Sequence, residues 1–327
     1  MELTEIWFVA ITILWVGYFV LEGFDFGVGM LLHVMARNDG EREAMLDTIG
    51  PVWDGNEVWL ITAGGATFAA FPEWYASLFS GFYVPLLLIL LALIVRGVAI
   101  EYRGKRSSVT WRRWCDAGIA IGSFVPALLW GVAFANIVRG VRLNSHHDYV
   151  GTVGDLLNPY ALLGGLTTLF LFVTHGAVFV ALKTSGEISR RATTLALQSG
   201  GVAALLAVIF LVWTQFHGGG PGTVILAALA ALSFVAALGA VAKGRQGWAF
   251  LLSAVAVGVT VICLFAVLYP NVLPSTVNPA YSLTLQNAAS TPKTLGIMTR
   301  IAAIFLPLVV LYQSWTYWVF RHRISAG

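Results

Sequence analysis

The chain has 327 residues, of which 58% are hydrophobic and 11% are charged, with 19 Lys and Arg against 16 Asp and Glu. This composition, with a mean hydropathy of +0.81, excludes a nucleic-acid-binding protein and a disordered chain. Because the apolar runs are continuous over helix length instead of alternating, they also exclude a β-barrel. We therefore expect an all-α polytopic membrane protein, forming a single integral membrane domain over residues 1–327.

About 20 apolar residues are needed to cross a bilayer, and nine segments meet this length. In chain order, the predicted helices cover residues 6–35, 51–72, 77–100, 116–138, 159–182, 194–216, 222–242, 247–269 and 297–320. We expect two four-helix bundles plus one peripheral helix. The connection 270–296 is polar and nearly uncharged and contains several prolines, so it is predicted to be an ordered lid and not a helix.

Basic residues are distributed very unequally between the two ends of these helices. Fourteen Lys and Arg residues fall on one side, whereas only Arg139, Arg142 and Lys293 fall on the other. Since basic residues concentrate in cytoplasmic loops, this bias predicts an external N-terminus and a cytoplasmic C-terminus. Nine crossings place the two termini on opposite sides of the membrane, which agrees with this orientation.

Ionisable residues inside the predicted helices are costly and need either partners or a function. There are six in the first four helices: Glu22, Asp25, Asp54, Glu57, Arg96 and Asp116. All fall in the predicted cytoplasmic half, so we expect four helices to converge there on one polar cluster. One interpretation is an ion-paired network that fixes helix register. The other is a proton-conducting or proton-loading site, which the excess of five carboxylates over one buried arginine favours.

The sequence offers few ligands for a haem or a metal ion. Of six histidines, only His175 is predicted to lie in mid-membrane, and it has no second histidine at a matching depth. Cys115 and Cys263 have no metal-binding spacing. We therefore expect no haem or metal on this chain, and expect His175 to be a neutral, hydrogen-bonded core residue.

Several motifs are similar to those of a known family. They include EGFDFGVGM (22–30), PVWDGNEVWLITAGGATFAAFP (51–72), GSFVPALLWGVAFAN (122–136), PSTVNPAYSLT (274–284) and LYQSWTYW (311–318). These stretches run in collinear order from end to end of the chain. On these residues the chain resembles subunit II of the cytochrome bd quinol oxidases.

The resemblance implies a haem-free subunit in a heterodimer of the bacterial cytoplasmic membrane. Its partner, subunit I, carries haem b and haem d, oxidises quinol and reduces dioxygen to water with protons taken from the cytoplasm. Asp25, Asp54, Arg96 and Asp116 are the positions that the motifs carry over, with Asp54 the first choice for proton uptake. A quinone and lipid are candidate ligands, and small accessory membrane subunits are candidate partners.

Two features depart from the family pattern. Glu22 and Glu57 stand where relatives have a different acid or a neutral amide. The external segment 218–222 is very short, so a function of the longer insertion found there in some relatives does not transfer.

Two other classes of function compete with the oxidase subunit. One is a stand-alone proton- or cation-coupled transporter that uses the same acids, and the other is a haem-b membrane cytochrome. A transporter would have broken helices in two equivalent halves, whereas the acids here are confined to the first four predicted helices. A co-purifying haem protein would identify the oxidase.

Overall fold

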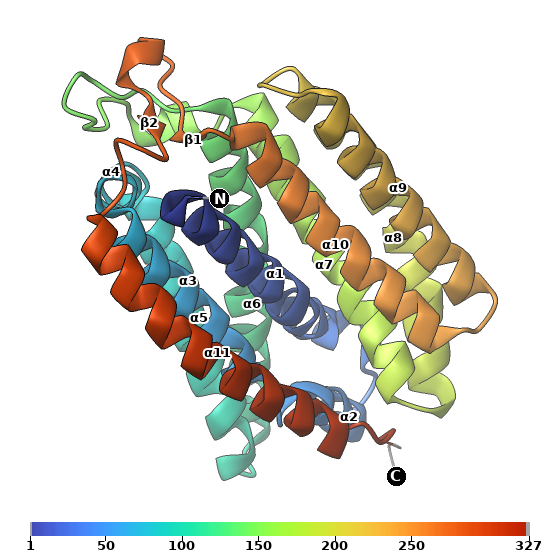
Figure 1. Cartoon of the computed structure of the whole chain (residues 1–327). Helices are drawn as coiled ribbons and strands as arrows, with labels where there is room; N and C mark the ends of the chain where they lie inside the picture. Colours follow the sequence, from blue (N-terminus) through green and yellow to red (C-terminus); the bar gives the residue numbers. More distant parts are fainter. Residues whose placement is uncertain (1, 325–327) are drawn as a thin grey trace.

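The computed structural model describes residues 2–324, so residues 1 and 325–327 of the predicted membrane domain lie outside it. The described chain is almost entirely α-helical (Figure 1). Its α-helices are α1 (Leu3–Met35), α2 (Asp39–Ile49), α3 (Trp53–Ala70), α4 (Pro72–Gly81), α5 (Tyr83–Tyr102), α6 (Val109–Arg139), α7 (Pro159–Lys183), α8 (Gly186–Gln215), α9 (Pro221–Ala242), α10 (Gln246–Leu268) and α11 (Pro292–Val319). Two short antiparallel strands, β1 (Asn271–Leu273) and β2 (Leu283–Thr284), complete the fold together with the short 3-10 helices η1 (Arg103–Lys105), η2 (Val153–Leu156) and η3 (Pro279–Tyr281).

Eight of the described helices are long and apolar enough to cross a membrane. The remaining predicted crossing is present as α3, whose 18 residues span about 27 Å at 1.5 Å per residue, close to the thickness of the hydrocarbon core. Its first turns contain Asp54, Asn56 and Glu57, which lower its mean hydropathy. The all-α polytopic fold is thus confirmed.

Helices α2 and α4 were not predicted as separate elements, because neither has the length of a membrane span. The predicted helix 77–100 is interrupted at Phe82, and its first residues belong to α4. Helix α2 begins where the Asn38 side chain accepts a hydrogen bond from the backbone N–H of Glu41 at 2.9 Å, a standard helix start. Helix α4 begins at Pro72. Proline disfavours helical geometry in the residue before it, and Phe71 accordingly separates α3 from α4.

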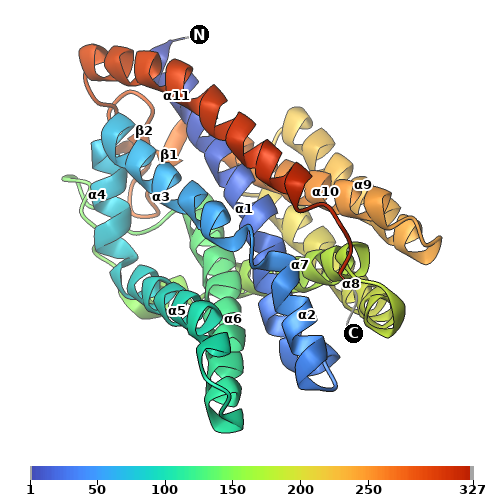
Figure 2. The same cartoon turned by 90° about the horizontal axis from the view of Figure 1, so that it is seen from below.

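Helix α1 runs through the middle of the molecule and packs against α3, α6, α7 and α10 (Figures 1 and 2). On one side, α7 packs on α8, α8 on α9, α9 on α10 and α10 on α7, which makes a closed four-helix group. The other side contains α3, α5 and α6. Helix α11 is peripheral. Only 6% of the residues in its most apolar stretch are buried, and its main helix contacts are with α1 and α3.

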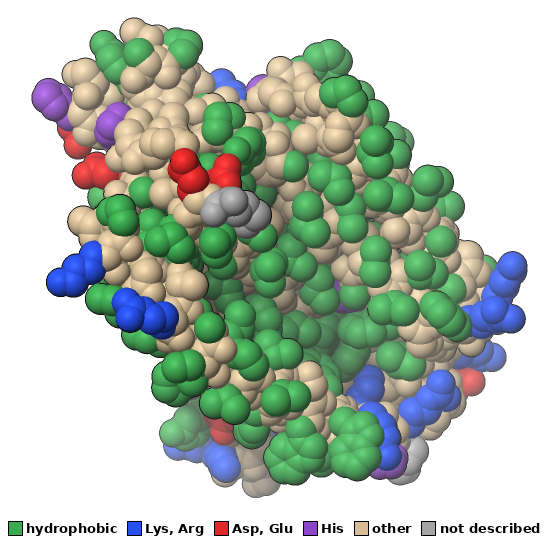
Figure 3. Space-filling model, viewed as in Figure 1, with side chains coloured by type: hydrophobic (Ala, Val, Ile, Leu, Met, Phe, Trp, Pro, Cys, Tyr) green, Lys and Arg blue, Asp and Glu red, His purple; other side chains and the backbone are tan. Residues whose placement is uncertain are grey.

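Apolar side chains cover most of the face seen in Figure 3, while Lys and Arg lie toward its margins. At the predicted external end, residues 270–291 fold over the helix ends as an ordered segment, whereas residues 292–296, predicted to be non-helical, form the start of α11. There the Val141 N–H donates to the Pro274 carbonyl at 3.0 Å and the Thr276 N–H donates to the Val141 carbonyl at 2.9 Å. This agrees with the predicted lid.

Candidate functional site

Five side chains from three helices form a polar group inside the helix bundle, here called the membrane cluster: Glu22, Asp25, Asn56, Glu57 and Arg96. Arg96 of α5 is fully buried. Its guanidinium donates hydrogen bonds to Glu22 of α1 and, at 2.9 Å, to Glu57 of α3. A buried guanidinium is tolerated only when carboxylates compensate for its lost hydration, so Arg96 holds three helices together.

Close helix packing puts Arg96 in this position. At Gly122 of α6, an added Cβ atom would lie 2.6 Å from the Ala92 carbonyl oxygen and 2.7 Å from the Arg96 Cβ. Only glycine lets α5 approach α6 so closely. The guanidinium carbon also lies 4.9 Å from the centre of the Phe26 ring, a cation–π distance.

Asp25, also fully buried, has a different partner. Its Oδ2 atom accepts a hydrogen bond from the Asn56 side-chain amide at 2.6 Å, and no ion pair within 4.0 Å involves it among the described residues. Asn56 Oδ1 in turn accepts hydrogen bonds from Tyr317 at 2.8 Å and from Gln313 at 3.2 Å. Asp25 is thus joined to α11 through a neutral amide.

Four buried polar atoms of the membrane cluster have no hydrogen-bond partner in the described part of the chain. They are Oδ1 of Asp25, Oε2 of Glu22, and Nε and Nη2 of Arg96. Buried polar atoms without a protein partner are normally satisfied by ordered water. The cluster is therefore suited to hydration, which proton transfer between carboxylates requires.

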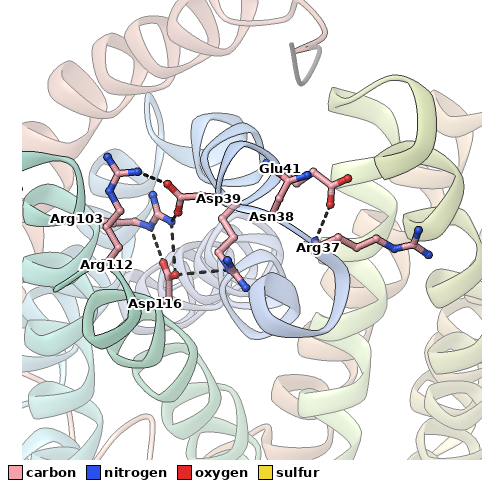
Figure 4. Close-up of polar contacts among 8 residues, drawn as sticks. Arg37, Asn38, Asp39, Glu41, Arg103, Arg112 and Asp116 are labelled. Carbon is pink, nitrogen blue, oxygen red and sulfur yellow. Dashed lines mark hydrogen bonds and ion pairs between the residues drawn. The ribbon is translucent and has the colours of Figure 1, made fainter. Parts of the chain in front are cut away.

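Figure 4 shows Asp39, Arg103, Arg112 and Asp116 converging in a second group, here called the helix-end cluster, which lies where α2, α5 and α6 end or begin. It comprises Asp39, Arg42, Arg103, Arg112 and Asp116. Arg103 donates to Asp116 at 2.5 Å and to Asp39 at 2.5 Å. Arg112 also pairs with Asp39, and Arg42 lies 3.7 Å from Asp116.

The two arginines beside Asp39 determine its ionisation. Partial burial by itself raises the pKa of Asp39, but hydrogen bonds from Arg103 and Arg112 and their positive charges outweigh that effect. The pKa of Asp39 therefore lies below its usual value. The ion pairs of this group fasten α2 to the end of α5 and the start of α6.

The structure corrects two expectations about these acids. Asp116 does not join the other predicted residues, because it pairs with Arg103 in the helix-end cluster. Arg103, which lies between the predicted helices 77–100 and 116–138, is only 4% exposed, so Arg96 is not the only buried arginine.

Asp54 is exposed, and its carboxylate accepts a hydrogen bond from the neighbouring Gly55 N–H. Arg96 pairs with Glu22 and Glu57 and not with Asp54.

Sequence reasoning missed three polar members of this region: Asn56, Gln313 and Tyr317. Asn56 lies within the PVWDGNEVW segment, but only ionisable residues were considered as site candidates, and an amide is not ionisable. Gln313 and Tyr317 are four residues apart and share one face of α11, and this spacing on an otherwise apolar helix was the available signal.

His175 is held as a core residue, as predicted. One ring nitrogen lies 3.1 Å from the Val20 carbonyl oxygen and the other 2.8 Å from the Ser253 hydroxyl. Its ring stacks on Phe250 with centroids 4.9 Å apart. Within residues 2–324, no group of three or more His, Cys, Asp or Glu side chains is placed to hold a metal ion.

A cavity of about 540 Å³ is lined mainly by α3, α4 and α5, with further side chains from α1, α6 and α10. Its lining is mostly aliphatic and aromatic and includes Trp15, Phe68, Phe79, Leu90 and Phe134. Such a lining suits a hydrocarbon chain, and it supplies few polar groups to orient a ring with carbonyl oxygens.

Comparison with known proteins agrees with the predicted resemblance. The family model described as cytochrome bd terminal oxidase subunit II matches residues 3–320. The chain is 39% identical over 329 residues to cytochrome bd ubiquinol oxidase subunit 2 of Bacillus subtilis (strain 168), covering 99% of this chain and 97% of that one. It is 36% identical over 358 residues to cytochrome bd-I ubiquinol oxidase subunit 2 of Escherichia coli (strain K12), covering 98% and 94% respectively.

A solved structure, the bd oxidase from Geobacillus thermodenitrificans, has a similar fold. The TM-score is 0.79 with 17% sequence identity, over 98% of this chain and 99% of that chain. The family match over nearly the whole chain, the two relatives and the shared helical fold lead to one conclusion. The chain belongs to the cytochrome bd terminal oxidase subunit II family and is a multi-pass subunit of a bd-type oxidase in the bacterial inner membrane.

Proposed function

We propose that this chain is the haem-free subunit of a quinol-oxidising, dioxygen-reducing complex, and that its membrane cluster takes up protons from the cytoplasm. Its partner in the proposal is the haem-bearing subunit I, with haem b and haem d. The family assignment and the relatives named ubiquinol oxidase subunits support the reaction. They give no support to a stand-alone transporter.

One observation carries the proton-uptake role: Asp25 is fully buried and bonded to an amide, while Glu22 and Glu57 share Arg96. Glu22 and Glu57 are bound in ion pairs with Arg96, whereas Asp25 is bonded to a neutral amide and has no counter-charge in direct contact. In this proposal Asp25 is the exchanging group. The exposed Asp54 collects protons at the start of α3 and passes them to Asp25. Asp25 thus takes the main proton-uptake role that the sequence had suggested for Asp54.

The outer face of α3 supports the presence of a partner subunit. Asp54 is exposed there, and the Glu57 side chain is 24% exposed. A carboxylate that faces lipid inside the hydrocarbon core is unfavourable. Subunit I, seated against α3 and α11, would remove these groups from lipid and bring the membrane cluster next to the redox centres.

The 540 Å³ cavity supports a bound apolar chain, from a lipid or from the tail of a quinone. In this proposal the cavity binds an apolar chain and takes no part in the redox reaction.

The proposal is tested by Asp25→Asn in the purified complex, with haem-to-protein ratio and quinol-driven oxygen consumption per haem measured together. The amide is nearly isosteric, so haem content should stay normal while turnover falls at least tenfold. Asp47→Asn, which changes an exposed acid of α2, is the matched control and should behave like the parent. Normal turnover of Asp25→Asn across the pH range would refute the proton-uptake role.

The haem-free character is tested separately. The tagged chain, purified without subunit I, should show no haem absorption. Stoichiometric haem in that preparation would contradict this part of the proposal.

A further inference from the structure

Four side chains from three helices form a continuous series of hydrogen bonds that ends on Asp25. The Trp59 indole N–H donates to Oε1 of Gln313 at 2.7 Å. The Gln313 amide donates to Oδ1 of Asn56 at 3.2 Å, and the Asn56 amide donates to Oδ2 of Asp25 at 2.6 Å. The series starts on α3, crosses to α11, returns to α3 and ends on α1.

The chemistry of its first member fixes the direction of this series. A tryptophan indole can only donate, whereas each primary amide can both donate and accept. Trp59 therefore requires the oxygen of Gln313, which leaves the Gln313 amino group for Asn56. Asn56 must then accept with its oxygen, and only its amino group remains for Asp25.

Trp59 cannot easily leave this position. Its ring packs directly over Gly17 of α1, where even an added Cβ atom would overlap the ring. Tyr317 also donates to Asn56 Oδ1, but a hydroxyl can rotate and accept instead. Among these residues only Trp59 is an obligate donor, so it alone sets the direction.

We infer that Trp59, acting through Gln313, is a positioning residue that keeps the amino group of Asn56 turned toward Asp25. A donor on Oδ2 favours the ionised carboxylate and directs an incoming proton to Oδ1, the oxygen without a protein partner. A reversed Asn56 would present its oxygen instead and would require a protonated Asp25. This inference rests on the proposed role of Asp25 as the proton acceptor.

Other charged or titratable groups also act on Asp25, and the test must leave them in place. They are Glu22 on the same helix, Asp54 and Glu57 on α3, Arg96 on α5 and Tyr317 on α11. Neither Trp59 nor Gln313 carries charge, so replacing them with neutral side chains changes the direction of the hydrogen bonds without changing the net charge near Asp25.

The experiment compares Trp59→Phe, Gln313→Met and the double variant in the purified complex with subunit I. The readout is oxygen consumption per haem as a function of pH, with haem-to-protein ratio as the measure of assembly. Trp248→Phe, an exposed tryptophan of α10, is the matched control. Each single variant should move the midpoint of the pH profile upward by about 0.5 unit or more, as expected for losing one directed hydrogen bond.

The double variant should shift the midpoint no further than the larger single shift, because both changes interrupt the same series. Additive shifts, or unchanged midpoints with normal haem content, would overturn the inference. If Trp59→Phe lowers haem content, Gln313→Met decides the question, since it leaves the Trp59 packing over Gly17 intact. Asp25→Asn distinguishes failure of the proposed function from failure of the positioning role. If Asp25→Asn leaves the pH dependence of oxygen consumption unchanged, the proposed function is refuted. If Asp25→Asn changes that pH dependence but the Trp59 and Gln313 variants keep the parental midpoint, only the positioning role is refuted.

Discussion

Gly27 of α1 and Gly176 of α7 lie backbone against backbone where the two helices cross. A Cβ atom added to Gly176 would be 2.5 Å from the Cα of Gly27, and one added to Gly27 would be 2.7 Å from the Cα of Gly176. Small residues that allow such approach are the usual basis of helix association in membranes. This crossing anchors the half of α1 that carries Glu22 and Asp25.

Gly176→Ala should therefore destabilise the protein by about 1–3 kcal/mol, because the new methyl group has no space and α1 must move. Gly201→Ala, at a helical position of α8 with no atom within 4 Å of the added Cβ, should be neutral or slightly stabilising. The thermal midpoint of the purified complex measures both. An equal midpoint in the two variants would show that the crossing tolerates a side chain.

Arg96→Gln should prevent normal assembly, since it leaves Glu22 buried without its cation at a cost of about 3–5 kcal/mol. The double variant Glu22→Gln with Arg96→Gln removes both charges and should recover part of the yield of haem-containing complex. Arg300→Gln, an exposed position on α11, is the control. If the Arg96 variant assembled as well as the Arg300 variant, the ion pairs would not be structural.

The helix-end cluster should give a pH-dependent contribution to stability. The pKa of Asp39 is lowered in the folded protein, so the stabilisation is present above the unfolded-state pKa of about 3.9 and is lost as pH falls through the folded-state value. Asp39→Asn should thus lower the thermal midpoint at neutral pH, and the difference from the parent should shrink below about pH 4. A difference that stayed constant down to pH 3 would contradict an ionised Asp39.

The orientation in the membrane is tested by single introduced cysteines. Cys115 and Cys263 are buried, so background labelling by an impermeant reagent should be low. Cysteines at Arg106, Gly186 and Gly244 should react only from the cytoplasmic side, and cysteines at Ser145, Gly219 and Thr291 only from outside. External reaction at Arg106 would reverse the orientation and remove the route for cytoplasmic protons.

The long helices were predictable because a run of about 20 apolar residues can hardly adopt another structure in a bilayer. Helices α2 and α4 lack that signal, and their starts depend on local features at Asn38 and Pro72. The membrane cluster was predictable as a set of acids near Arg96, because charges in mid-membrane need partners.

The pairing within that set was not predictable, because it depends on how the helices cross. Arg103 and Asp116 are thirteen residues apart, and only the path of η1 and the start of α6 brings them together. Asn56 and Tyr317 are 261 residues apart, and nothing local indicates that α11 returns to α3. Contacts of this kind are set by tertiary packing and not by spacing along the chain.

The central claim is that cytoplasmic protons enter through Asp25. The most direct measurement is proton uptake on the cytoplasmic side of sealed vesicles during quinol-driven oxygen reduction, followed with a pH-sensitive dye in the parent, Asp25→Asn and Asp47→Asn complexes. Proton uptake and oxygen consumption should slow together in Asp25→Asn, with normal haem content, and should remain at the parental rate in Asp47→Asn. Parental rates of proton uptake in Asp25→Asn would contradict the central claim.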